Sequence, residues 1–228
     1  MSGPPVLLLH GFATSCARTW GENGWLDLIG EGGREIIGVD LLGHGEADKP
    51  HDPAAYDLTE QLVLDQLPDE PVDAIGFSLG SRTLLAIASE HPERFNRIVV
   101  SGVGDNLFRR DNERGKAIEA AIAGGGDDTD REAAYFGQLA ESAEIDREAL
   151  VACMKRPNPP AITAEGLANI TQPVLVVLGD QDFAGPPDPL MDKLPDATLK
   201  VLRKVDHFGT PKDYGFMDAA LSFLEINP

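Results

Sequence analysis

The sequence has few cysteines and no long hydrophobic run, and each shortage excludes a class of protein. Cys16 and Cys153 are the two cysteines of 228 residues, and they offer neither a disulfide framework nor the spacing of a metal site. We therefore expect two reduced thiols. No apolar stretch approaches the roughly 20 residues that cross a bilayer. The N-terminus lacks the basic region of a signal peptide and its apolar run covers only residues 6–9, so a cytoplasmic location is expected.

Positive charge is also scarce. Lys and Arg number 19 against 38 Asp and Glu, which gives a formal net charge of −19. Such an acidic chain disfavours nucleic acid and anionic membranes as partners, because their phosphates would repel it. A highly anionic small molecule would need local basic residues in order to bind. The sequence leaves the oligomeric state open.

Six apolar runs predict the strands of a mostly parallel sheet. They cover residues 6–10, 35–40, 72–77, 97–101, 173–179 and 197–202. The first five are nearly continuous in apolar residues, as expected for strands that are buried on both faces. Helix-like stretches at residues 25–30, 58–67, 79–90 and about 214–224 lie between or after them. This alternation predicts a doubly wound α/β architecture.

Residues 105–160 depart from this pattern, because they contain no strand-like run. Three amphipathic stretches lie near residues 107–123, 131–143 and 146–155, and a proline-rich linker at residues 156–160 follows them. We expect a helical insertion between the fourth and fifth strands. The predicted division is a core of residues 1–104 and 161–228 with an inserted helical unit of residues 105–160.

The pentapeptide Gly-Phe-Ser-Leu-Gly at residues 76–80 follows the third apolar run and opens into a helix-like stretch. Strand, tight turn and helix form the setting that a G-x-S-x-G nucleophile elbow requires. Gly76 and Gly80 allow helix and strand to approach closely, because a Cβ at either position would clash. Ser78 is therefore a candidate nucleophile, the alternative being a small residue in a glycine-rich turn.

Four further motifs surround this elbow in order. They are His-Gly-Phe at residues 10–12, Asp-Leu-Leu-Gly-His-Gly at 40–45, Gly-Asp-Gln-Asp at 179–182 and Asp-His-Phe at 206–208. With these motifs the chain resembles the α/β-hydrolase superfamily over nearly its whole length. The resemblance implies a triad in the order Ser, Asp, His, an oxyanion hole, and a helical cap formed by residues 105–160. Relatives usually carry an antiparallel hairpin before the first strand, and its absence predicts a sheet of six strands.

By this resemblance Ser78 is the nucleophile, His207 the general base and Asp182 the acid that holds the imidazole. Of five histidines, His207 is the one that follows the last strand, at the end of the sheet where the loops meet the elbow. Asp180 is the alternative acid, but the family pattern G-x-x-D places the carboxylate at Asp182. His10 and Asp206 are expected to be structural.

The resemblance also implies an oxyanion hole and a pocket. Its donors would be the backbone N–H groups of Phe12 and Leu79, and such donors contribute about 3 kcal/mol each to the stability of the transition state. The short cap predicts a small to medium pocket. Candidate substrate-binding side chains, each of which could instead belong to the core of the cap, are Trp20, Phe108, Tyr135, Phe136 and Leu139, with Phe12, Leu107 and Met154 beside them.

A Ser-His-Asp triad with an oxyanion hole transfers acyl groups to water. We therefore expect a hydrolase that cleaves carboxylic esters of small or medium size through an acyl-enzyme, with no metal and no organic cofactor. A lactonase or a C–C bond hydrolase of ring-cleavage products would use the same triad. The dianionic substrates of the latter need basic residues, for which Arg82, Arg109 and Arg110 are candidates. A non-catalytic ligand receptor on the same fold is a further alternative.

Overall fold

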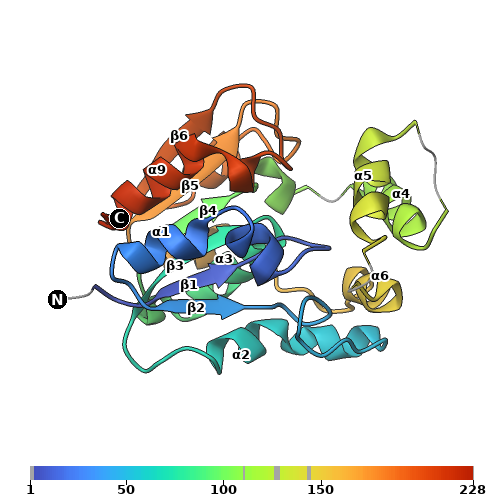
Figure 1. Cartoon of the computed structure of the whole chain (residues 1–228), viewed down its shortest axis with the longest axis horizontal. Helices are drawn as coiled ribbons and strands as arrows, with labels where there is room; N and C mark the ends of the chain where they lie inside the picture. Colours follow the sequence, from blue (N-terminus) through green and yellow to red (C-terminus); the bar gives the residue numbers. More distant parts are fainter. Residues whose placement is uncertain (1–2, 110, 126–128, 143–144, 228) are drawn as a thin grey trace.

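The computed structural model describes residues 3–109, 111–125, 129–142 and 145–227, which contain one sheet of six parallel strands (Figure 1). The strands are β1 (Val6–Leu9), β2 (Ile36–Val39), β3 (Val72–Phe77), β4 (Phe95–Ser101), β5 (Val174–Gly179) and β6 (Ala197–Leu202). Their order is β2-β1-β3-β4-β5-β6, and every neighbouring pair is parallel. The predicted six-stranded α/β fold is confirmed, and within the described residues the sheet is wholly parallel.

Helices connect the strands and cover the sheet. They are α1 (Trp25–Glu31), α2 (Thr59–Leu64), α3 (Leu79–Glu90), α4 (Asn112–Ile122), α5 (Arg131–Leu139), α6 (Arg147–Met154), α7 (Ala164–Ala168), α8 (Asp188–Met191) and α9 (Tyr214–Phe223). Shorter helical turns are η1 (Ala17–Gly21), η2 (Pro53–Leu58), η3 (Pro92–Arg94), η4 (Asp105–Leu107) and η5 (Thr210–Lys212). In the described part of the chain, no helix has the length and apolar character needed to cross a membrane.

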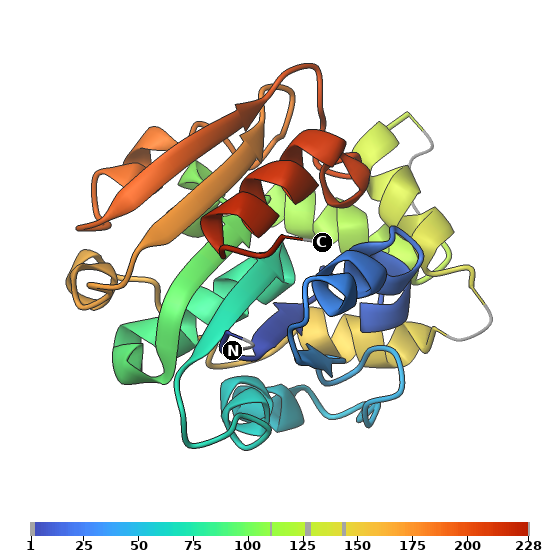
Figure 2. The same cartoon turned by 60° about the vertical axis from the view of Figure 1, so that its left-hand side comes forward.

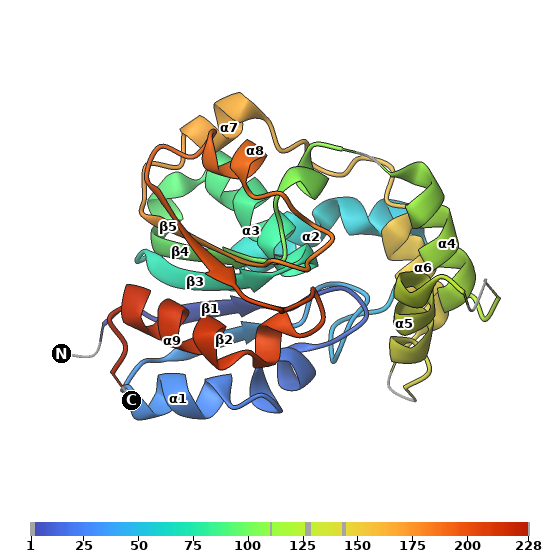
Figure 3. The ribbon, with the colours of Figure 1, turned by 90° about the horizontal axis from the view of Figure 1, so that it is seen from above.

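Both faces of the sheet are buried at the central strands β1, β3 and β5, and the alternation of side chains along β1 shows how. Leu7 and Leu9 join the cluster on the side of α2 and α3, whereas Val6 and Leu8 join the cluster on the side of α1 and α9. Successive residues of a strand point to opposite faces, so a strand between two helix layers must be apolar throughout. Figure 3 shows the two helix layers, and Figure 2 shows α9 in front of the sheet.

Helices α4, α5 and α6, here called the α4–α6 bundle, lie beyond the carboxyl ends of the strands (Figures 1 and 3). The bundle has its own apolar cluster, which includes Ile118, Ile122, Phe136 and Leu150. It is tied to the core where the Tyr56 hydroxyl donates to the carbonyl oxygen of Ala149 at 2.8 Å. Its role as a separate cap of residues 105–160 stays a prediction.

The strand order places a crevice at the carboxyl ends of β1 and β3. The chain passes from β1 outward to β2 and then returns to β3 on the other side of β1. The loops after β1 and β3 therefore leave in different directions, and ligands of open α/β sheets bind at such a switch point. Phe12 follows β1 and Ser78 follows β3, so the fold brings both to this crevice.

Candidate active site

Ser78 occupies the turn between β3 and α3 in a strained conformation, with φ 52° and ψ −109°. A positive φ is costly for a residue with a side chain and persists where the surroundings impose it. Here the Ser78 N–H donates to the carbonyl oxygen of Ser101 at 2.8 Å. A Cβ on Gly76 would lie 2.8 Å from the backbone of Ser81, and one on Gly80 would overlap the carbonyl oxygen of Leu9. The close approach that the sequence predicted for both glycines is present.

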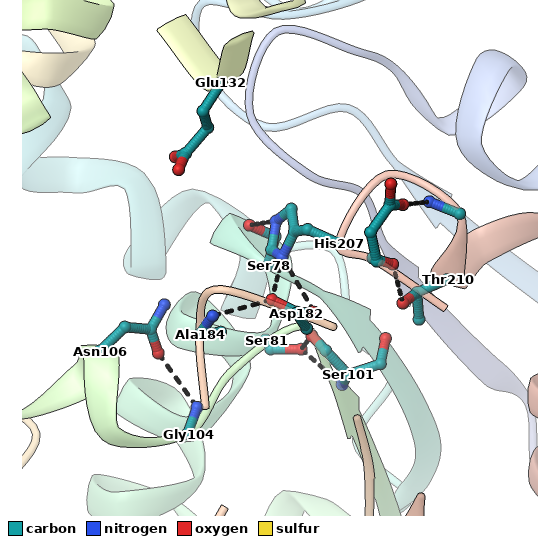
Figure 4. Close-up of polar contacts among 12 residues, drawn as sticks. Ser78, Ser81, Ser101, Gly104, Asn106, Glu132, Asp182, Ala184, His207 and Thr210 are labelled. Atoms are coloured by element: carbon teal, nitrogen blue, oxygen red, sulfur yellow. Dashed lines mark hydrogen bonds and ion pairs between the residues drawn. The ribbon is translucent and has the colours of Figure 1, made fainter. Parts of the chain in front are cut away.

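The loops after β5 and β6 bring Asp182 and His207 to Ser78 (Figure 4). His207 Nε2 lies 2.9 Å from Ser78 Oγ, and its Nδ1 lies 2.9 Å and 3.1 Å from the two carboxylate oxygens of Asp182. A carboxylate accepts, so Nδ1 carries the proton and the Ser78 hydroxyl donates to Nε2. The Asp182 carboxylate also accepts the N–H of Ala184 at 2.8 Å. The geometry can activate a hydroxyl for nucleophilic attack.

The two other aspartates near the triad serve their own loops. Asp180 is exposed, and its carboxylate accepts the N–H of Lys204 at 2.6 Å. Asp206 is exposed as well and accepts the N–H of Gly209 at 2.8 Å. Asp182 and His207, by contrast, are 9% and 2% exposed. Burial strengthens the hydrogen bond between them and keeps water from competing for it.

Aromatic rings pack around the imidazole of His207. Phe183 stacks on it with ring centroids 4.2 Å apart, and Phe77 lies at 5.0 Å. Phe208 meets it edge-on at 5.5 Å. A Cβ on Gly102, where φ is +66°, would lie 2.9 Å from His207 Cε1. These contacts restrict the orientation of the ring, so that both nitrogens keep their partners.

His10 and His44 are buried and support the loop that carries Phe12. His10 Nε2 accepts the N–H of Leu41 at 3.0 Å, and its Nδ1 donates to the carbonyl oxygen of Gly11 at 2.7 Å. Burial lowers the pKa of His10, and burial together with His10 lowers the pKa of His44 to about 3. Both rings are therefore neutral near pH 7, which suits a structural role.

The two cysteines are poor nucleophiles. Burial raises the pKa of Cys16 to about 11 and that of Cys153 to about 12, so both thiols keep their protons. Within the described ranges, no three side chains of His, Cys, Asp or Glu are grouped as a metal site would need.

Phe12 and Leu79 lie beside Ser78. Leu79 is the first residue of α3, and the N–H groups of a first helical turn have no acceptor within the helix. Gly11 runs close to the nucleophile candidate, since a Cβ on it would be 3.6 Å from the Cβ of Ser78. The side chain of Phe12 lines the same cavities as Ser78. Their role as oxyanion donors stays a prediction.

Two cavities meet at Ser78. The smaller one, of about 210 Å³, is also lined by Thr14, Tyr135, Leu139, His207 and Phe208. The larger one, of about 1070 Å³, is also lined by Leu79, Arg82, Val103, Met154 and Phe183. Phe12 and Phe136 also line both cavities. Tyr135, Phe136, Leu139 and Met154, which the sequence analysis named as candidate pocket residues, thus line these cavities, and their role in binding a substrate stays a prediction.

Trp20 and Phe108 lie elsewhere, and their expected place in the pocket is wrong. Trp20 is fully buried in the core, 5.2 Å from the ring of Trp25. Phe108 packs against the apolar cluster beside α3, with the ammonium of Lys193 4.6 Å above its ring. The sequence distinguishes poorly between an aromatic residue that lines a pocket and one that fills a core, because both positions remove the ring from water.

The larger cavity holds charges of both signs. Arg82 and Arg109 line it, and Arg110 lies outside the described residues. The Arg109 guanidinium forms an ion pair with Asp105. Three more acids line the same cavity, namely Asp111, Glu113 and Glu132. The basic residues expected from the sequence are thus accompanied by carboxylates.

Several residues at the site were missed by sequence reasoning. Phe183 and Phe208 contact His207, and each directly follows a triad residue in the sequence. Their position directly after a triad residue could have identified these two aromatic residues from the sequence. Arg114 and Glu132 also line the larger cavity, but they come from α4 and α5. Nothing in the local sequence marks those two positions.

Comparisons with known proteins agree with the fold. The family described as alpha/beta hydrolase fold matches residues 4–117. A carboxylesterase structure from the thaumarchaeon Nitrososphaera gargenis aligns over 98% of this chain and 90% of its own, with a TM-score of 0.74 and 21% identity.

Curated relatives match somewhat less than half of the chain. A putative 2-succinyl-6-hydroxy-2,4-cyclohexadiene-1-carboxylate synthase of Bacillus subtilis is 35% identical over 107 residues, which cover 45% of this chain and 37% of the relative. A 2-hydroxymuconate semialdehyde hydrolase of Pseudomonas sp. is 33% identical over 108 residues, which cover 44% and 37%. The chain thus spans little more than a third of the length of these relatives.

Proposed function

Because the chain belongs to the α/β-hydrolase fold family, we propose that it is a serine hydrolase that cleaves carboxylic esters of small to medium size. Ser78 is the proposed nucleophile, His207 the general base and Asp182 the acid. The observation that carries the proposal is the continuous hydrogen-bonded chain from Ser78 Oγ through His207 to Asp182, each step at 2.9 Å. A serine in a strained turn at the end of a central strand supports it.

The proposed first step is acylation. Ser78 Oγ attacks the ester carbonyl carbon while its proton passes to His207 Nε2. Asp182 stabilises the imidazolium that forms and keeps Nδ1 protonated. The oxyanion accepts hydrogen bonds from the backbone N–H groups of Phe12 and Leu79. Leu79 suits this role because it lies at the N-terminus of α3, where the helix dipole favours negative charge. His207 then gives its proton to the alkoxide, and the alcohol leaves.

The proposed second step is deacylation. A water molecule gives its proton to His207 and attacks the acyl-enzyme, and the collapse of the tetrahedral intermediate returns the proton to Ser78. His207 lines the smaller cavity and Leu79 the larger one. Since the leaving group must face His207, we place the alcohol in the smaller cavity and the acyl group in the larger one.

The α4–α6 bundle contributes side chains to both cavities. Its residues Tyr135, Phe136 and Leu139 line the smaller cavity, and Glu132 and Met154 line the larger one. We therefore propose that residues 105–160 act as the cap that selects the substrate. The core, residues 1–104 and 161–228, would supply the triad.

A C–C bond hydrolase is the second candidate. It is favoured by the likeness to a 2-hydroxymuconate semialdehyde hydrolase and by the presence of Arg82 and Arg109 in the larger cavity. Carboxylates in the same cavity oppose it, because they would repel an anionic substrate. A lactonase needs no change to the triad and is tested by the same assays.

The test is hydrolysis of p-nitrophenyl acetate by the intact chain and by Ser78→Ala. We expect a burst of p-nitrophenol from the native protein and a loss of at least about 10³-fold in rate for Ser78→Ala. Ser222→Ala is the matched control, since Ser222 is exposed near the C-terminal end of α9 and is not among the described residues that line either cavity. It should retain full activity.

Other outcomes separate the alternatives. Faster consumption of a ring-cleavage dienoate than of any ester would favour the C–C bond hydrolase. Binding of esters or lactones without turnover would favour a receptor. A Ser78→Ala variant that keeps most of its esterase rate would remove Ser78 as the nucleophile.

A further inference from the structure

A cation from the α4–α6 bundle lies over an aromatic ring that itself stacks on His207. The guanidinium carbon of Arg114, in α4, is 3.9 Å from the ring centroid of Phe183. The Phe183 ring is 4.2 Å from the imidazole of His207, with 29° between the planes. Guanidinium, phenyl ring and imidazole therefore follow one another in van der Waals contact. Stacking of this kind restrains the ring in the middle and, through it, the imidazole.

Arg114 is held in place by Glu132 of α5. The two side chains form an ion pair that includes a hydrogen bond from Arg114 Nε, and they are 32% and 24% exposed. Both line the larger cavity together with Ser78 and Phe183. Figure 4 shows Glu132 above the triad in that view. The planar guanidinium can stack on a ring and bind a carboxylate in its own plane at once, which an ammonium cannot.

We propose that Arg114 and Glu132 are positioning residues for His207: together they clamp the imidazole through Phe183 and keep the net charge beside it near zero. The proposal rests on the proposed role of His207 as general base. It links the α4–α6 bundle to the reacting group as well as to the substrate.

The charge argument depends on what faces His207 from each side. Asp182 contacts its Nδ1, while Arg18, Glu22 and Lys212 line the smaller cavity that His207 also lines. On the bundle side stand Arg114 and Glu132. If Arg114 is lost, the Glu132 carboxylate is uncompensated and favours the imidazolium. If Glu132 is lost, the Arg114 cation is uncompensated and disfavours the imidazolium form of His207.

The test follows the protonation midpoint of His207 by NMR in protein labelled with ¹³C at histidine, with the His207 signal identified by its absence in His207→Gln. In Arg114→Gln the midpoint should rise by about half a pH unit, and in Glu132→Gln it should fall by a similar amount. The double variant should return close to the native midpoint. The acidic limb of the pH profile of kcat/KM should shift in the same direction and by the same amount as the His207 midpoint.

Arg114→Lys separates stacking from charge. The lysine keeps the positive charge but loses the planar stack on Phe183. We expect the midpoint of His207 to stay unchanged, while kcat falls about three- to tenfold with little change in KM. A residue that merely bound substrate would raise KM instead.

Lys155→Gln is the matched control, because it removes one positive charge from the same bundle at an exposed position paired with Glu119 of α4, and neither residue is among those that line the two cavities. This variant should leave the protonation midpoint of His207 unchanged. Shifts of the same sign in Arg114→Gln and Glu132→Gln, or none in either folded variant, would overturn the proposal. The NMR readout needs no turnover, so it stands even if Ser78→Ala were to leave the activity intact, a result that would instead remove the proposed function.

Discussion

Asp182 Oδ1 lies 2.9 Å from His207 Nδ1, whereas the carboxylate of Asp180, two residues earlier, is turned to the backbone N–H of Lys204 at 2.6 Å. The same short loop after β5 thus directs one carboxylate to the imidazole and the other to the loop after β6. The difference gives two conservative substitutions with opposite expectations.

Asp182→Asn should lower kcat by about 10⁴-fold, because an amide can favour the wrong tautomer of His207 and cannot stabilise the imidazolium. Asp180→Asn should change kcat less than about threefold, since an amide oxygen can still accept the N–H of Lys204. The measurement is ester hydrolysis at pH 7 to 8 for both variants. A larger loss in Asp180→Asn than in Asp182→Asn would reassign the acid.

Leu139→Trp tests which cavity holds the alcohol. Leu139 lines the smaller cavity and not the larger one among the described residues, so a bulky ring there should fill the proposed alcohol site. We expect kcat/KM for benzyl acetate to fall at least about tenfold more than for ethyl acetate, a difference of about 1.4 kcal/mol. A series of ethyl esters with growing acyl chains should retain its native ranking. If the acyl series changes instead, the two cavities have the opposite roles.

Buried histidines should make the protein sensitive to acid. The pKa of His44 is lowered to about 3 from an ordinary value of 6.5, so between these values the unfolded chain binds a proton that the folded protein does not. The free energy of unfolding should therefore fall as pH falls below 6.5, by about 2 kcal/mol at pH 5 from His44 alone. His10, whose pKa is lowered too, adds to this trend, while exposed His51, whose pKa is raised beside Asp146, opposes it weakly.

Urea unfolding at pH 7 and pH 5 measures this effect. His44→Asn should reduce the difference between the two pH values, even though it lowers stability at both. His91→Asn, at a position whose side chain is 45% exposed, is the control and should leave the difference unchanged. An equal pH dependence in the native protein and His44→Asn would show that His44 does not titrate as expected.

Arg34→Met should destabilise the fold while sparing the chemistry. Arg34 and Asp73 form an ion pair with side chains 5% and 3% exposed, at the end of the sheet opposite Ser78. Removing the cation leaves Asp73 buried and unpaired, at a cost of about 3 to 5 kcal/mol in the free energy of unfolding. At low temperature, kcat should match that of the native protein. A double variant, Arg34→Met with Asp73→Leu, should recover only part of the loss, since the carbonyl oxygens of Pro4 and Leu224 still lose the hydrogen bonds that Arg34 donates. A cost below about 1 kcal/mol in the single variant would contradict the prediction.

Much of the site could be predicted because its residues sit in short motifs at the ends of strands. Gly76 is required by contacts with Gly80 and Ser81 close to it in the sequence, whereas Gly80 is required by the backbone of Leu9, so only part of the requirement is local. The helices α7 and α8, with five and four residues, were not predicted, since they are too short for a hydrophobic period to be visible.

The sequence alone indicated the parallel sheet and the elbow, because apolar runs and glycines carry local physical requirements, while the candidate triad came from the resemblance of its ordered motifs to a known family. Only the tertiary structure decided which aromatic residues surround the site. It placed Trp20 in the core and Phe183 against His207, and it brought Arg114 and Glu132 from two helices to the same cavity. Such contacts join residues far apart in the chain. They depend on how the helices pack against one another, and this packing cannot be read from the local sequence.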